Sequence, residues 1–97
     1  MKVIIDEEAQ GDLDRIYVWI AKDNPRAADE VIEHVLKMFE ILDRFPHMGH
    51  PGRSRATFEW AIARLPYIIV YELKADRDQL IVTGVFHGAQ KNRRTHH

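Results

Sequence analysis

The spacing of apolar residues predicts two helices in the first half of the chain. Between Leu13 and Ile20 they recur every three or four positions, with charged residues between them, as in a helix with one buried face. A second stripe follows Asn24-Pro25 and keeps one face for about fifteen residues. Its members are Ala28, Val31, Ile32, Val35, Met38, Phe39 and Leu42. We expect helices over about residues 6–22 and from residue 25 to Phe45, paired as an antiparallel hairpin.

The period then changes to two, which is typical of strands. Aromatic and β-branched residues alternate with others over 57–62, form a run over 67–71 and return over 80–86. A further strand is expected at Lys2 to Ile5. The segment His47 to Ser54 is rich in Gly and Pro and is expected to be a loop. The sequence thus predicts an α+β fold with a two-helix hairpin packed on a mainly antiparallel four-stranded sheet, in the order β-α-α-β-β-β.

The composition is that of one small folded domain. The chain has 97 residues, 45% of them hydrophobic, which provides a core for a domain over residues 1–90 but no second domain. Cysteine is absent, which excludes disulfides and thiolate chemistry and suits a reducing cytoplasm. The first residues turn acidic after a short apolar run, so neither a secretion signal nor a membrane span is expected. Residues 91–97 form a basic tail, whose His96 and His97 match the start of an affinity tag and enter no site argument.

Charge is distributed unevenly along the chain. Residues 1–45 carry six basic and eleven acidic residues, a net of −5, whereas residues 46–97 carry eight and four, a net of +4. Two stretches contain no acidic residue at all, Arg44 to Phe58 and His87 to His97. We expect the positive second half to meet either phosphate groups or an acidic protein.

Several strings of residues, in this order and at these spacings, resemble the RelE/ParE superfamily of type II toxin–antitoxin toxins, over about residues 2–90. They are Ala9 with Asp12-Leu13 and Ile16, Asn24-Pro25 with Ala27-Ala28, the segment Phe45 to Arg53, the run Leu65 to Tyr71, and His87-Gly88-Ala89-Gln90. The resemblance implies a compact plasmid-stabilisation toxin that works without a cofactor. It also implies a cognate antitoxin that wraps the toxin, in a complex of higher order.

The superfamily contains two kinds of activity, and the sequence offers candidates for both. RelE-like members resemble ribonucleases that cut messenger RNA in the ribosome, which requires a general acid or base and cations converging on one phosphate. The candidates for that chemistry are His50, Arg53, Arg55, Arg64, Tyr71 and His87. ParE-like members act on DNA gyrase instead. The candidates for binding a target or the antitoxin are Arg53, Arg55, Arg64, Lys91, Arg93 and Arg94.

Two departures favour a protein target over RNA. Many family members carry Gly-Thr-Arg-Glu-Leu after the loop, where this chain has Ala56-Thr57-Phe58-Glu59-Trp60, so that Phe58 replaces a cation. The net charge of −1 is also a poor match to a protein that grips RNA. His47, His50 and His87 give only a weak metal pattern, and no metal is expected. The sequence therefore predicts a ParE-like toxin that binds gyrase or a similar protein, the alternatives being a ribosome-dependent endoribonuclease and a non-toxic relic that binds only the antitoxin.

Overall fold

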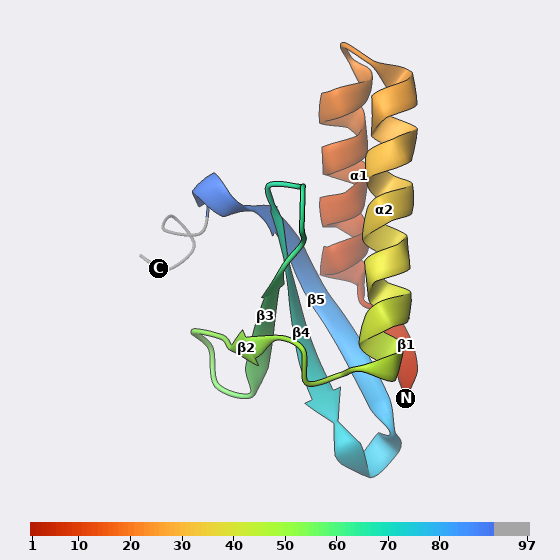
Figure 1. The fold of residues 1–97 in the computed structure, drawn as a ribbon. Helices are drawn as coiled ribbons and strands as arrows, with labels where there is room; N and C mark the ends of the chain where they lie inside the picture. The colour runs from red at the N-terminus through yellow and green to blue at the C-terminus, as the bar shows by residue number, and fades with distance from the viewer. Residues whose placement is uncertain (91–97) are drawn as a thin grey trace.

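The computed structural model describes residues 1–90 and has two layers, a helical hairpin and a twisted sheet (Figure 1). The elements are β1 (Lys2–Ile5), α1 (Glu7–Ala21), α2 (Pro25–Arg44), β2 (His50–Pro51), β3 (Thr57–Ala61), β4 (Tyr67–Lys74), the short 3₁₀ helix η1 (Ala75–Arg77), β5 (Gln79–His87) and η2 (Gly88–Gln90). The strands lie in the order β1-β5-β4-β3-β2. The α+β class predicted from the sequence is confirmed.

The sheet has five strands where four were expected. The additional strand is β2, which lies inside the predicted loop and pairs antiparallel with β3. β3, β4 and β5 form the expected antiparallel meander. β1 pairs parallel with β5, from which the helical hairpin and strands β2 to β4 separate it in the chain. A two-residue strand made of His50 and Pro51 has no alternating pattern, so periodicity did not reveal it.

Both helices begin where side chains can satisfy the free backbone N–H groups of the first turn. The carboxylate of Asp6 accepts a hydrogen bond from the N–H of Ala9 at 2.9 Å, at the start of α1. Asn24 does the same for Ala27 at 3.1 Å, and Pro25 occupies the first position of α2, where its missing N–H has no cost. The predicted helix boundaries therefore agree with the observed ones to within a residue.

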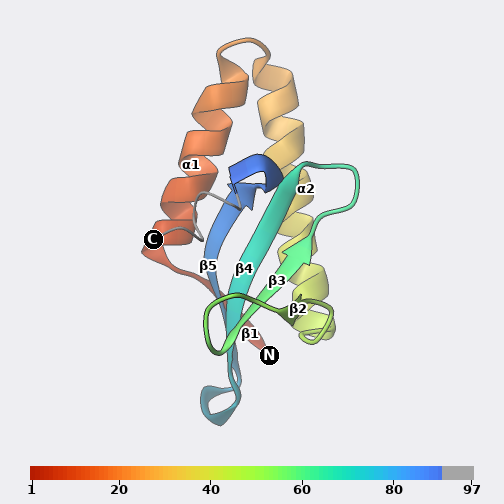
Figure 2. The ribbon, with the colours of Figure 1, turned by 90° about the vertical axis from the view of Figure 1, so that its left-hand side faces the viewer.

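The core lies between the hairpin and one face of the sheet. It is formed by buried side chains from both layers, namely Ala9, Leu13, Val35, Phe39, Leu42, Ile62, Tyr67, Ile69, Tyr71, Leu80, Val82 and Val85. β4 is the central strand, and the hairpin lies behind it in Figure 2. Its alternate residues Ile68 and Val70 face the other side of the sheet and are only half-buried. One face of the sheet is thus core, and the other remains partly accessible.

A local irregularity shapes the sheet. The register between β4 and β5 shifts between Val70 and Tyr71, so that Thr83 is an extra residue on β5. Its hydroxyl donates to the Val70 carbonyl at 3.3 Å.

Within residues 1–90, neither helix combines the length and the apolar composition that crossing a membrane requires.

Candidate functional site

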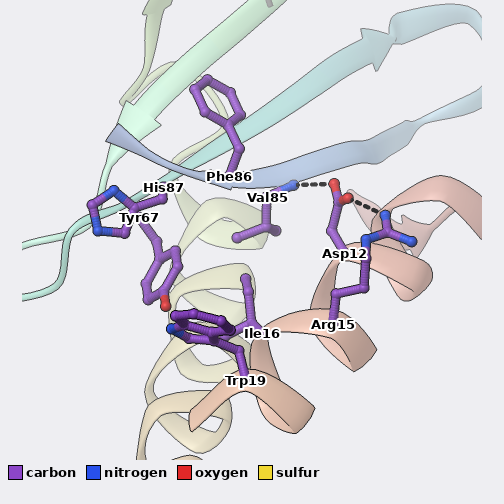
Figure 3. Close-up of a pocket in the computed structure, with 8 residues that line it drawn as sticks. All are labelled: Asp12, Arg15, Ile16, Trp19, Tyr67, Val85, Phe86 and His87. Atoms are coloured by element: carbon purple, nitrogen blue, oxygen red, sulfur yellow. Dashed lines mark hydrogen bonds and ion pairs between the residues drawn. The ribbon is translucent and has the colours of Figure 1, made fainter. Parts of the chain in front are cut away.

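A groove lies between α1 and the last third of β5 (Figure 3). β1 pairs with β5 only from Gln79 to Val82, whereas β5 continues to His87. The edge of β5 is therefore not covered by β1 along its final residues. α1 passes beside this stretch, and the space between them has a volume of about 540 Å³.

An acidic side chain fixes the inner end of the groove. Asp12 is buried on α1, and its Oδ2 accepts a hydrogen bond from the backbone N–H of Val85 at 2.9 Å. Its Oδ1 accepts from Nη2 of Arg15 at 2.6 Å, and the Arg15 side chain is mostly exposed. The Asp12 carboxylate thus bonds the backbone of β5 beyond the end of β1.

The walls of the groove are largely apolar. Ile16 and Trp19 extend from α1, while Tyr67 and Val85 extend from the sheet towards them, as Figure 3 shows. Trp19 is 71% exposed, an unusual position for a large aromatic side chain. Tyr67 is buried, and burial raises the pKa of its hydroxyl. An exposed Trp beside a concave apolar surface is typical of a site for another protein chain.

His87 lies at the outer end of the groove. Its ring packs edge-on against Tyr67, with the ring centroids 5.6 Å apart. Its Nδ1 accepts a hydrogen bond from the Ala89 N–H at 3.0 Å, which places the proton of the neutral ring on Nε2. Phe86, the preceding residue, points to the opposite side of β5 (Figure 3).

The structure separates the remaining residues proposed for catalysis. Arg53 and Arg55 precede β3, and Arg64 follows it, so they stand at opposite ends of a strand that spans roughly 17 Å. Arg64 shares its end with His87, because the N–H of Gly88 donates to the Pro66 carbonyl. His50 lies in the edge strand β2. The candidates thus fall into two groups, with Arg53 and Arg55 before β3 and Arg64 and His87 at its other end.

Tyr71 lies in the core rather than on the surface. It is fully buried, and its hydroxyl donates to the Pro46 carbonyl at 2.8 Å and accepts from the Gly49 N–H at 3.0 Å. Burial raises the pKa of this hydroxyl, and the Gly49 hydrogen bond partly opposes that effect. A Cβ on Gly49 would stand 2.7 Å from the hydroxyl oxygen, which is why this position has no side chain. Tyr71 therefore anchors the loop after α2.

Phe58 takes part in the same anchor. Its ring stacks on that of Tyr71, with the centroids 5.5 Å apart and the planes 20° apart. The residue that replaces the family's arginine is thus packed against the core. Lys91, Arg93 and Arg94, which were also proposed for binding, lie outside the described residues.

His47 and His50 lie between α2 and β3, whereas His87 ends β5. Among residues 1–90, no three His, Asp or Glu side chains lie close enough together to hold a metal ion. The sequence interpretation also missed Trp19 and Arg15 as site residues. The signal for Trp19 was its type, since a tryptophan outside the core stripe of an amphipathic helix needs another partner.

The fold and sequence have known relatives. The model of the family described as "ParE toxin of type II toxin-antitoxin system, parDE" matches residues 3–92. The protein named "Putative toxin Y4kP" of Sinorhizobium fredii is 39% identical over 70 residues, which cover 72% of this chain and 73% of that relative.

Two solved structures are similar. One is a chain of the chromosomal ParDE TA system from P. aeruginosa, with a TM-score of 0.78 and 17% identity over 90% of this chain and 95% of that one. The other belongs to the toxin-antitoxin complex RelBE2 from Mycobacterium tuberculosis, with a TM-score of 0.58 and 26% identity over 89% and 95%. The match over nearly the whole sequence shows that the chain belongs to the ParE toxin family of type II toxin–antitoxin systems.

Proposed function

We propose that this toxin arrests growth as ParE-like proteins do, by binding a protein target such as DNA gyrase. The observation that carries the proposal is the separation of the candidate catalytic residues between the two ends of β3. RNA cleavage needs a general acid or base and positive groups within reach of one phosphate. Arg53 and Arg55 lie at one end of β3 and Arg64 at the other, while the Tyr71 hydroxyl is buried with both of its hydrogen bonds made. Such an arrangement suits a binding surface better than a nuclease centre.

We also propose that the groove receives a segment of the cognate antitoxin. The similar solved chains come from a ParDE system and from a toxin-antitoxin complex. An extended segment beside the last residues of β5 would pair with the strand beyond Val85, because the Asp12 carboxylate already accepts the Val85 N–H. It would place apolar side chains against Trp19, Ile16 and Tyr67. This mode combines backbone pairing with side-chain pockets, as strand addition does in other proteins.

A ribosome-dependent endoribonuclease is the second candidate. Two observations favour it, namely the 26% identity to a chain of the RelBE2 complex and the placement of Arg64 and His87 at one end of the sheet. In that case the imidazole of His87 would supply the acid or base.

The test is induced expression of the untagged chain without antitoxin. Growth, transcript integrity and plasmid supercoiling are followed in the same cells. Arrest with intact transcripts and lost supercoiling supports the gyrase proposal. Arrest with ribosome-dependent transcript cuts overturns it in favour of the ribonuclease, and the absence of arrest would identify a relic that only binds antitoxin.

A further inference from the structure

The segment between α2 and β3 exposes large apolar side chains among cations. Phe45 is 58% exposed and Met48 is 48% exposed. Arg44, Arg53 and Arg55 surround them in the chain, and none forms an ion pair with any residue in 1–90. We call these five residues the loop patch. Exposed apolar groups next to unpaired charge are typical of a surface that another protein covers.

The carboxylates near the loop patch are already engaged. Asp43 pairs with the amino group of Met1 at 3.3 Å, and Glu72 pairs with Lys74 at 3.3 Å. Glu59 is buried, and its Oε2 lies 3.5 Å from the backbone nitrogen of Arg53. The charge that this surface presents is therefore positive, although the whole chain carries −1.

The core holds in place the part of the loop patch that contains Phe45 and Met48. The Tyr71 hydroxyl bonds both Pro46 and Gly49, on either side of Met48. The N–H of Met48 also donates to the Phe45 carbonyl at 3.1 Å, which closes a tight turn. A surface fixed in this way loses little conformational entropy when it binds, so its apolar side chains can contribute fully to affinity.

We propose that the loop patch is the surface through which this toxin grips its protein target, and that the target presents an acidic surface with an apolar pocket for Phe45 and Met48. The inference rests on the proposed function and adds the place of contact. Two large exposed apolar side chains favour a protein partner over a nucleic acid, because binding of a nucleic acid would depend on the cations alone. The neighbouring edge strand contains Pro51, which has no N–H to pair with an added strand, so side chains carry the contact.

The loop patch and the groove face different parts of the molecule. The loop begins at the lower end of α2 in Figure 1, whereas the part of β5 that lines the groove is the upper end of that strand. Target and antitoxin therefore use separable surfaces. Substitutions in one should leave binding at the other unchanged.

The experiment compares two pairs of variants of the full chain. The apolar pair is Phe45→Ala with Met48→Ala, and its control is Leu36→Ala, an exposed apolar position on α2. The charge pair is Arg53→Glu with Arg55→Glu, and its control is Arg26→Glu with Arg77→Glu. Growth arrest, inhibition of purified gyrase, affinity for purified antitoxin and thermal unfolding are measured for each.

We expect inhibition and arrest to require at least roughly tenfold more of either double variant than of the wild type. The affinity of each double variant for antitoxin should stay within about twofold of the wild-type affinity. The controls should behave as the wild type does. If the patch variants inhibit gyrase as strongly as the wild type does, the inference is overturned and the proposed function stays intact. A parallel loss of antitoxin affinity also overturns it, because the patch would then belong to the antitoxin site. If the toxin binds a short DNA duplex, and the charge pair loses this binding while the apolar pair keeps it, the surface would be assigned to nucleic acid. A wild type that neither arrests growth nor inhibits gyrase refutes the proposed function itself.

Discussion

Asp12 and Val85, 73 positions apart, are joined by a hydrogen bond of 2.9 Å from the Val85 N–H to the Asp12 carboxylate. The bond forms just past the end of β1, whose last link to β5 runs from the N–H of Asp6 to the Val82 carbonyl. The carboxylate thus satisfies a strand N–H that β1 no longer reaches. It ties α1 to the sheet at the inner end of the groove.

Replacing Asp12 should reveal how much its hydrogen bond to Val85 contributes to the free energy of unfolding. Asp12→Ala leaves the Val85 N–H buried without its acceptor and should lower the free energy of unfolding by about 2–3 kcal/mol in urea titrations. Asp12→Asn keeps an acceptor oxygen and should cost less than half as much. Arg15→Ala serves as the control, since that guanidinium is 72% exposed and its ion pair contributes little. Equal losses for the alanine variants at positions 12 and 15 would contradict this account.

The Tyr71 hydroxyl should stabilise the loop after α2. Tyr71→Phe removes two hydrogen bonds and keeps the ring, so the free energy of unfolding should fall by about 1–2 kcal/mol. Hydrogen exchange at Gly49 should accelerate in the same variant, because its N–H loses its acceptor. Tyr17→Phe, at an exposed position on α1, is the matched control. Unchanged protection of Gly49 in the Tyr71 variant would show that the loop is held by other contacts.

The same buried phenol predicts an alkaline loss of stability. Burial raises the pKa of Tyr71 in the folded protein above its ordinary value of 10.0, and burial does the same to Tyr67. The unfolded chain releases these protons at a lower pH than the folded protein does. The two phenols therefore leave the free energy of unfolding at its full value below pH 10 and lower it as the pH rises beyond 10. Tyr71→Phe with Tyr67→Phe should flatten this fall in denaturant titrations between about pH 9 and pH 11. An equally steep fall in the double variant would assign the effect to other groups.

Ala56 adopts a backbone conformation that suits glycine. Its φ is 65°, in the left-handed region, and it stands where the family string Gly-Thr-Arg-Glu-Leu begins. Ala56→Gly should relieve this strain and raise the free energy of unfolding by up to about 1 kcal/mol in thermal or urea denaturation. The control Ala61→Gly, in β3, should lower it by a similar amount. A destabilised Ala56→Gly variant would contradict the argument.

Most of the fold follows from local patterns in the sequence. The stripes on α1 and α2 and the alternation in β3 have strong periods, and the caps Asp6 and Asn24 mark the helix starts. β2 could not be predicted, because a two-residue strand depends on its partner β3 and not on any period of its own. The parallel pairing of β1 with β5 likewise depends on the path of the hairpin between them.

The site was less accessible to sequence reasoning than the fold. The cations were recognised by type, but residue type does not show that Arg55 and Arg64 lie at opposite ends of β3. Tyr71 was a candidate because tyrosine can act as an acid, whereas its burial follows from tertiary packing. Trp19 was overlooked because its environment is formed by β5, which is distant in the chain.

Trp19 should be a main anchor of the proposed antitoxin contact. Trp19 is 71% exposed in the free toxin, and Nζ of Lys22 lies 5.7 Å from its ring centroid. Trp19→Ala should therefore change the free energy of unfolding by less than about 1 kcal/mol. Antitoxin would bury the ring against the groove, and truncation of a central tryptophan typically costs about 2 kcal/mol or more, roughly thirtyfold in affinity. Calorimetric titration with purified antitoxin measures this loss.

Val18→Ala provides the control for that experiment. Val18 is the neighbouring residue on α1 and is 58% exposed, but it does not line the groove. Its truncation should leave antitoxin affinity within about twofold, while both variants should retain toxicity if the target is bound at the loop patch. Loss of toxicity in Trp19→Ala at unchanged antitoxin affinity would reverse the assignment of the two surfaces.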